Sequence, residues 1–97
     1  MDLDSFKASL EQDEPPGELP GALLALWYAA KGDWHRAHEV AQAENDETGA
    51  WVHAYLHRVE GDQANAGYWY RRAGKARCEA PLQKEWEEIA ATLLPVS

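Results

Sequence analysis

WVHAYLHRVEGDQANAGYWYRRAGK, residues 51–75, carries the strongest helical pattern of this chain. Apolar residues recur in it at intervals of three and four, the spacing that places side chains on one face of a helix. Gly61 and Asp62 interrupt the pattern. We expect the glycine to end one helix in a left-handed conformation and the aspartate carboxylate to cap the next. The stretch therefore predicts two helices joined by a tight turn, and Gly74 ends the second.

The composition is that of one small globular domain, residues 1–97. Hydrophobic residues make up 45% of the chain, and typical domains contain about 100 to 150 residues. The formal net charge of −8 predicts that neither nucleic acid nor an anionic membrane is a partner, because both attract basic surfaces. No run reaches the ~18 apolar residues of a membrane span, and no signal-peptide pattern opens the chain. The lone Cys78 cannot form an internal disulfide, so we expect a cytoplasmic protein.

The segments before this stretch also follow helical patterns, and none alternates as a strand does. Residues 2–12 predict a short amphipathic helix, which Pro15 and Pro16 separate from the next segment. Pro20 opens a helix that is apolar nearly all round, and Gly32 turns the chain into another. We therefore predict an all-α fold of five to six helices.

A last helix is predicted over residues 81–94, and Pro95 ends it. Its apolar residues form a single stripe, and three acids occupy the side that we expect to face solvent. The stripe consists of Leu82, Trp86, Ile89, Ala90 and Leu93, and the acids are Glu85, Glu87 and Glu88.

The two middle helix pairs repeat one another. Four residues of the first pair recur in the second, each 29 positions later, in the frame Ala-x6-Gly-Asp-x3-Ala. They are Ala25, Gly32, Asp33 and Ala37 in the first copy and Ala54, Gly61, Asp62 and Ala66 in the second. Small residues at these places would let paired helices approach closely.

This frame resembles the tetratricopeptide repeat, whose pattern contains L-G-x2-Y followed by A-x3-F and has a period of about 34 residues. The run YWYRRAG resembles the helix ends of Sel1-type repeats. With WVHAYLHR, it is also similar to runs in a family of short bacterial proteins, which implies no particular activity. The resemblance implies two helical hairpins, about residues 19–45 and 47–75, and capping helices at about residues 2–12 and 81–94.

All four histidines fall in one window, and three of them are expected to gather. His53 and His57 are four residues apart and share a helical face, at places where the repeat has inward-facing apolar side chains. Buried imidazoles need hydrogen-bond partners, and we expect His38 and Glu39, on the preceding helix, to supply them. The simplest interpretation is that these histidines are hydrogen-bonded and bind nothing.

A divalent metal is a second interpretation of the cluster. Imidazoles one helical turn apart can meet one ion, so His38, His53 and His57 are the candidate ligands, with a carboxylate from Glu39 or Glu60. The firm zinc motifs, HExxH and paired CxxC, are absent. No other cofactor is expected.

Acid–base catalysis is a third interpretation. His53 or His57 would act as the general base near pH 7, and Glu39 or Glu60 would orient it. Arg58 or Arg71 would then hold an anionic substrate. No serine or cysteine nucleophile accompanies them, so hydrolysis through a covalent intermediate is not expected.

The repeat resemblance implies binding or assembly rather than catalysis. It implies a protein or peptide partner, an extended segment or a helix lying in a groove, and self-association through the apolar helix Ala22 to Ala30 is the alternative. The residues predicted to contact a ligand or partner are His38, Glu39, His53, His57, Arg58, Asn65, Tyr68 and Arg71.

Overall fold

The computed structural model describes residues 1–94, which form six α-helices and no strand. The all-α prediction is confirmed. The helices are α1 Leu3–Ala8, α2 Gly21–Ala30, α3 Trp34–Ala43, α4 Glu47–Val59, α5 Gln63–Ala73 and α6 Leu82–Leu93, and a 3-10 helix, Ser9–Glu11, follows α1. Within this part of the chain, no helix is long and apolar enough to cross a membrane. Pro95, predicted to end α6, lies outside the described residues.

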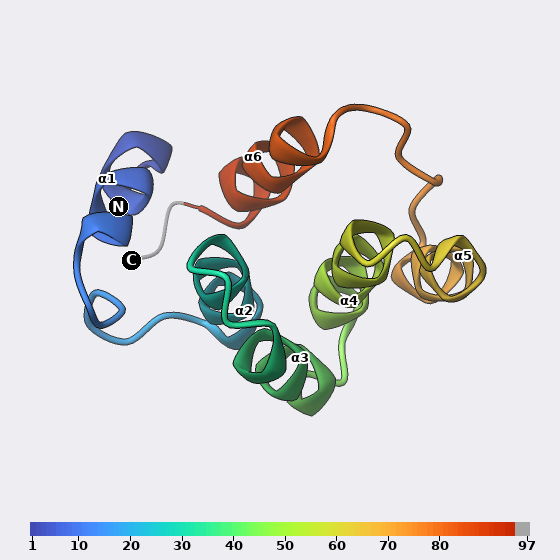
Figure 1. Ribbon diagram of the computed structural model, residues 1–97, viewed down its shortest axis with the longest axis horizontal. Coiled ribbons are helices and arrows are strands. Elements are labelled where there is room, and N and C mark those ends of the chain that lie inside the picture. Colours follow the sequence, from blue (N-terminus) through green and yellow to red (C-terminus); the bar gives the residue numbers. More distant parts are fainter. Residues whose placement is uncertain (95–97) are drawn as a thin grey trace.

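Two helical hairpins, α2–α3 and α4–α5, lie side by side, and α5 forms the edge of the molecule opposite α1 (Figure 1). Each turns at a glycine–aspartate pair. Gly32 and Gly61 both have a φ of +80°, a left-handed conformation that glycine adopts without a side-chain clash. The carboxylates of Asp33 and Asp62 then accept a hydrogen bond from the backbone N–H three residues further on, which caps the second helix of each hairpin. The predicted turns are therefore confirmed.

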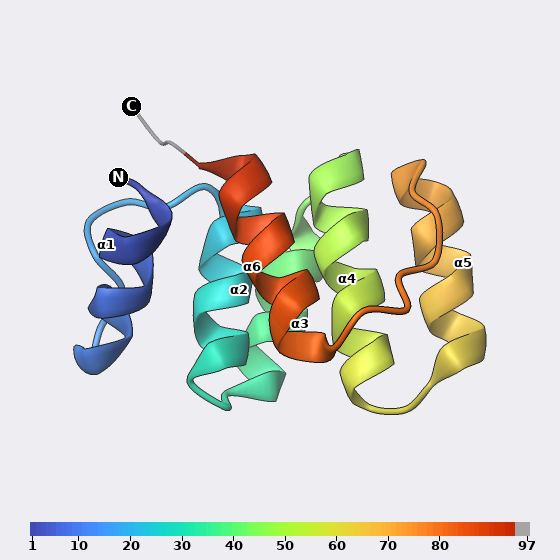
Figure 2. The same ribbon diagram turned by 90° about the horizontal axis from the view of Figure 1, so that it is seen from above.

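Helix α6 covers the face formed by α2 and α4, on the side away from α3 (Figures 1 and 2). Trp86 anchors it: the buried indole N–H donates to the backbone carbonyl of Leu26 at 3.0 Å, and the ring stacks on Phe6 of α1 with centroids 5.6 Å apart. The terminal helices thus cover the hairpins, as expected of capping helices. However, α6 lies over the α2–α4 face and does not stack beyond α5.

The predicted faces of α6 are wrong at two positions. Trp86, Ile89 and Ala90 are buried as predicted, but Leu82, the first residue of the helix, is exposed. Glu85, placed on the solvent side by the apolar stripe, is only 1% exposed. The reason is that α6 passes over polar groups of α4 and α5, which supply partners for a buried carboxylate.

The Glu85 carboxylate joins three helices. It accepts a hydrogen bond from the Arg58 guanidinium of α4 at 2.9 Å and another from the Tyr70 hydroxyl of α5. Arg58 also donates to the carbonyl of Ala80, just before α6. Burial and the bond to Glu85 raise the pKa of Tyr70 above its ordinary value, so the phenol stays protonated and donates. We call this group the Glu85 cluster.

Replacing Glu85 with alanine is expected to lower the free energy of unfolding by about 2 to 4 kcal/mol, because it leaves the largely enclosed Arg58 guanidinium and the Tyr70 hydroxyl without their partner. Urea unfolding followed by far-UV circular dichroism measures the loss. Glu88→Ala removes an exposed acid of the same helix and serves as the matched control, with an expected change within about 0.5 kcal/mol. A similar small loss in both variants would contradict the role given to the cluster.

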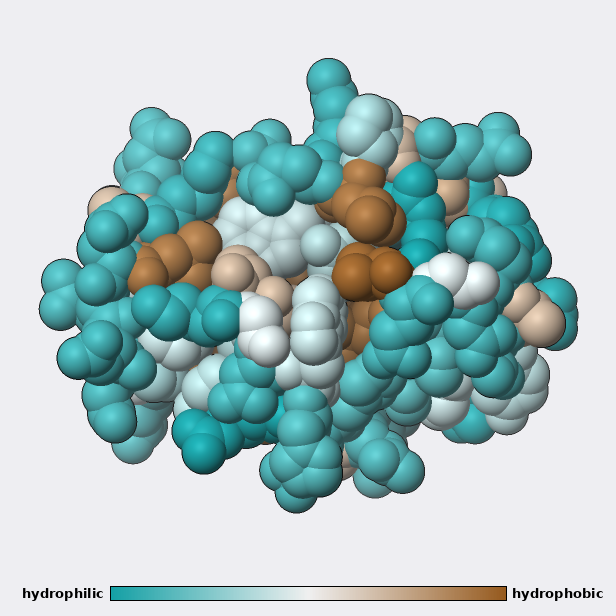
Figure 3. Space-filling model, in the orientation of Figure 1, coloured by the Kyte–Doolittle hydropathy of each residue, from teal (hydrophilic) through white to brown (hydrophobic). Residues whose placement is uncertain are grey.

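The apolar helix α2 is used inside the chain. It contacts α3, α4 and α6, and among its apolar residues only Ala30 is exposed. Its buried residues are Ala22, Leu23, Ala25, Leu26, Trp27 and Ala29. The helix therefore offers little apolar surface for the self-association that its sequence suggested. Hydrophilic residues cover most of the face shown in Figure 3, and apolar residues appear there in small separate patches, the most hydrophobic of them near the middle and toward the left.

Candidate functional site

Three histidines from α3 and α4 gather on the side of α4 away from α6. The ring centroid of His38 lies 5.5 Å from that of His53 and 5.6 Å from that of His57. The rings of His53 and His57 are stacked at 4.9 Å. The spacing in the sequence therefore located a real cluster, which we call the histidine cluster.

The outer members of the histidine cluster face carboxylates from the end of α4 and the turn after it. Nε2 of His38 pairs with Glu60. Nδ1 of His57 lies 3.6 Å from Oδ2 of Asp62, beyond hydrogen-bond distance. It is buried and has no hydrogen-bond partner within residues 1–94.

Two residues expected to serve the histidine cluster lie elsewhere. Glu39 has a side chain that is 64% exposed, and it pairs with His35 at 3.7 Å. It follows His38 directly, and consecutive helical residues point about 100° apart, so both cannot face the cluster. Asn65 is exposed, and its side-chain amide donates to Asp62 at 2.7 Å rather than to a histidine.

His53 is the most enclosed member of the histidine cluster. It is 8% exposed, and its ring stacks on Trp69 of α5 with centroids 4.0 Å apart. Within residues 1–94 it makes ring contacts but no hydrogen bond. Burial, and after it the neighbouring His57 and His38, lower its pKa to about 4. The imidazole is therefore neutral near pH 7 and offers one donor and one acceptor.

The ring geometry does not fit the predicted metal site. His53 and His57 are nearly parallel, with 11° between their planes, so their nitrogen lone pairs lie in separate planes and do not converge on one ion. Among residues 1–94, no three His, Cys, Asp or Glu side chains form a set that could hold a metal. The spacing of four residues places two imidazoles on one face, but it leaves their ring rotation open. The stack on Trp69 sets that rotation for His53.

The predicted catalytic arrangement is not formed either. Glu60, expected to orient His53 or His57, pairs with His38. Arg58, expected to hold an anionic substrate, has a side chain only 12% exposed and is bonded to Glu85. It faces α6 rather than α3, so it lies on the wrong side of α4 to act beside the histidine cluster.

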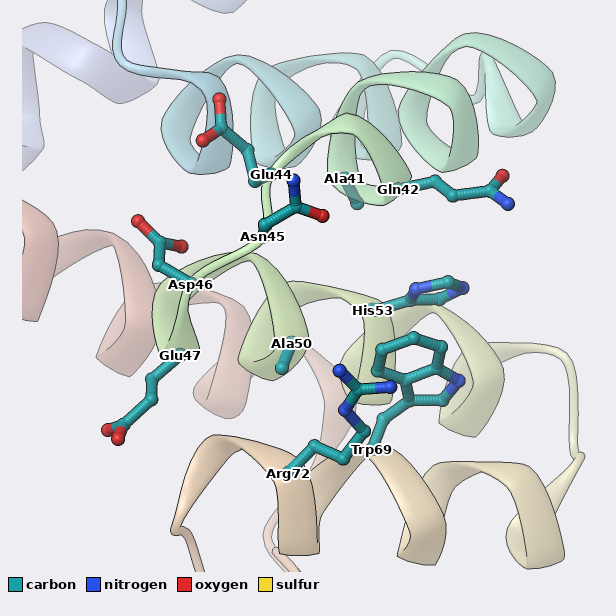
Figure 4. Close-up of a pocket in the computed structure, with 10 residues that line it drawn as sticks. All are labelled: Ala41, Gln42, Glu44, Asn45, Asp46, Glu47, Ala50, His53, Trp69 and Arg72. Carbon is teal, nitrogen blue, oxygen red and sulfur yellow. The ribbon is translucent and has the colours of Figure 1, made fainter.

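A recess of about 370 Å³ opens beside His53, in the angle between α3 and α5 (Figure 4). We call it the α3–α5 recess. Small side chains of α3 and α4 leave the space, and α5 contributes an aromatic ring and a cation. The lining residues are Ala41, Gln42, Glu44, Asn45, Asp46, Glu47, Ala50, His53, Trp69 and Arg72.

Arg72 is the cation of the recess, and Figure 4 shows its guanidinium beside the Trp69 ring. The guanidinium carbon lies 5.1 Å from that ring's centroid, and Nη1 donates to the Tyr68 hydroxyl at 3.1 Å. Among residues 1–94, Arg72 forms no ion pair with a carboxylate. The recess thus combines an unpaired cation with a neutral, unpartnered imidazole.

Three acids line the other end of the recess, but their carboxylates are directed elsewhere. Asp46 caps α4 and accepts two hydrogen bonds there, which lower its pKa. Glu44 lies against Gly21, where a Cβ would come within 1.5 Å of its Oε1. Glu47 points away from His53 (Figure 4). These acids make that end negative without pairing with Arg72.

Sequence reasoning chose Tyr68 and Arg71 on α5, whereas the structure brings Trp69 and Arg72 to the recess. Trp69 and Arg72 are three residues apart and share a helical face, while Arg71 is turned about 100° from Arg72. Tyr68 lies at the edge, bonded to Arg72. A helical wheel fixed on the buried Ala66, Tyr70 and Ala73 would have indicated the correct pair.

Comparison of the chain with protein-family models, with curated proteins and with solved structures finds no match. The resemblance to tetratricopeptide and Sel1-type repeats therefore stays a prediction, and the geometry of the site carries the functional argument.

Lowering the pH from 7 to 4.5 is expected to cost the wild type about 2 to 3 kcal/mol more stability than the His53→Leu variant. The folded pKa of His53, about 4, lies below its ordinary 6.5. Between these two pKa values, His53 is therefore protonated in the unfolded chain and neutral in the folded chain. Above about pH 6.5, proton uptake by His53 hardly changes the free energy of unfolding. Below that pH it lowers the free energy of unfolding progressively.

Urea unfolding at several pH values measures this difference. His35→Leu, which replaces the exposed histidine of α3, is the matched control and should keep the wild-type pH dependence. If His53→Leu also kept it, the neutral, enclosed state of His53 would be contradicted.

Proposed function

We propose that the protein is a small helical binding protein that holds a small polar molecule in the α3–α5 recess. The observation that carries the proposal is His53, a nine-tenths buried imidazole beside an open recess with no hydrogen-bond partner in the described chain. Its ring nitrogens are not sealed from solvent, so a bound molecule can replace water there and complete its hydrogen bonds.

The size and lining of the recess support this proposal. Ligand sites are typically concave, of about 300 to 1,000 Å³, with a few placed polar groups among apolar and aromatic ones. The recess, about 370 Å³, lies at the small end of this range. Trp69 supplies the aromatic wall, and His53 and Arg72 supply the polar groups. Binding without chemical conversion is the simpler function, because no carboxylate is placed to orient His53 as a base.

A protein-interaction module, which the repeat resemblance implies, is the second candidate. Tyr68 and Arg72 are exposed side by side at the mouth of the recess, and Tyr and Arg are enriched in interfaces. A segment of a partner would then insert a side chain beside Trp69. The face between α2 and α4 is the less suitable groove, because α6 already fills it.

Screening a library of small polar fragments by NMR tests the proposal. Molecules that bind are expected to shift the indole N–H signal of Trp69 and leave that of Trp34, an exposed ring on α3, unchanged. His53→Leu should stay folded and lose this binding, because leucine offers no donor or acceptor. His35→Leu, the exposed matched control, should bind as the wild type does. Binding that survives in His53→Leu, or no fragment that shifts Trp69, would contradict the proposal.

A further inference from the structure

We propose that the α3–α5 recess takes a small zwitterionic carboxylate, a molecule of the free amino acid class. Its carboxylate would pair with Arg72 and its cationic group would face the acidic end of the recess. This inference rests on the function proposed above and names the ligand class of the same site.

The guanidinium of Arg72 is placed to bind a carboxylate. Arg72 lies over two rings, with its carbon 5.1 Å from the Trp69 centroid and 5.8 Å from the Tyr68 centroid. Its bond to the Tyr68 hydroxyl occupies one N–H of Nη1. The remaining N–H groups form a planar fork that matches the two oxygens of a carboxylate. The two ring contacts and this bond restrict the guanidinium, so less side-chain freedom is lost when a ligand binds.

His53 provides the second contact. Its ring lies against the same indole, 4.0 Å from the Trp69 centroid, so one small molecule can reach both His53 and Arg72. With a pKa of about 4, His53 is neutral near pH 7. It therefore adds a hydrogen-bond donor and an acceptor without adding charge. A neutral imidazole suits a ligand that itself presents both donors and acceptors, as an amino acid does.

Charge decides between the anion classes that an arginine can bind. The recess has one unpaired cation, and three carboxylates line its other end. The chain as a whole carries −8. A phosphate monoester, with nearly two negative charges, would meet repulsion that a single arginine does not balance. A single carboxylate matches Arg72. Glu44, Asp46 and Glu47 direct their carboxylates out of the recess, but their negative charge still favours an ammonium over a second anionic group at that end.

Three probe pools separate the charge states of one set of molecules: the free amino acids, their N-acetyl derivatives, which lack the ammonium, and their amides, which lack the carboxylate. Saturation-transfer NMR detects weak binders in each pool. The best binder is then titrated while the Trp69 indole signal is followed. We expect the free form to bind about tenfold or more tightly than its amide, the loss that removal of one charge-assisted contact produces. The N-acetyl form should lie between them.

Arg72→Gln is expected to weaken the binding of the free amino acid about tenfold and to leave the binding of its amide unchanged. Arg71→Gln is the matched control, because it removes the same charge from the adjacent exposed position of α5, which does not line the recess. It should bind as the wild type does. Equal losses in both variants would mean that general charge, rather than the contact with Arg72, attracts the ligand, and would overturn the inference.

The remaining outcomes also separate the inference from the function on which it rests. Amides that bind as tightly as the free amino acids, or N-acetyl forms that bind more tightly than the free amino acids, would overturn the inference that the ligand is a zwitterion. So would inorganic phosphate that displaces the bound amino acid at equal concentration. If no pool binds while other fragments still shift the Trp69 signal, the ligand class is wrong and the binding function stands. If N-acetylated tripeptides with a free carboxyl end bind and free amino acids do not, the site belongs to a protein partner.

Discussion

The buried ion pair between Glu85 and Arg58 is the constraint on which the arrangement of the helices depends. A buried carboxylate is tolerated only with its partners in place, and these come from α4 and α5, while Glu85 itself belongs to α6. The three helices must therefore meet at one orientation for the charge to be neutralised. That orientation lays α6 across the face of α2 and α4, where Trp86 and Phe6 complete the core.

Helix α4 separates two polar groups of opposite character. On the side of α6, the Glu85 cluster is satisfied, because the carboxylate accepts from both Arg58 and Tyr70. On the side of α3 and α5, the histidine cluster is incomplete: Nδ1 of His57 is buried without a hydrogen-bond partner in the described chain, and His53 makes only ring contacts there. A satisfied network helps to fix a fold, whereas an incomplete one beside an open recess leaves polar groups available to a ligand. The same helix thus contributes to both the Glu85 cluster and the proposed site.

The position of α6 also bears on the repeat resemblance. Two hairpins with glycine–aspartate turns are present, as the repeated frame implied. Their α2–α4 face, however, is occupied by the chain's own last helix. The open surface is instead the angle between α3 and α5, where Ala41 and Ala50 leave space and α5 supplies Trp69 and Arg72. A partner groove inferred from the resemblance alone would lie on a face that α6 covers.

The sequence by itself determined the helices, the two turns and the gathering of the histidines. These features depend on neighbours within about four positions: apolar spacing sets a helical face, glycine permits a positive φ, and an aspartate caps the N–H groups that follow it. Such local rules need no knowledge of what packs against the helix.

Only the tertiary structure decided which partners the charged groups have. The apolar stripe of α6 placed Glu85 on the solvent side, yet the carboxylate is turned toward Arg58. Glu60 rather than Glu39 pairs with His38, and Arg72 rather than Arg71 enters the recess. Each choice depends on the rotation of a helix about its own axis, and one residue changes the direction of a side chain by about 100°. That rotation is set by contacts between segments far apart in the sequence, which no local pattern records.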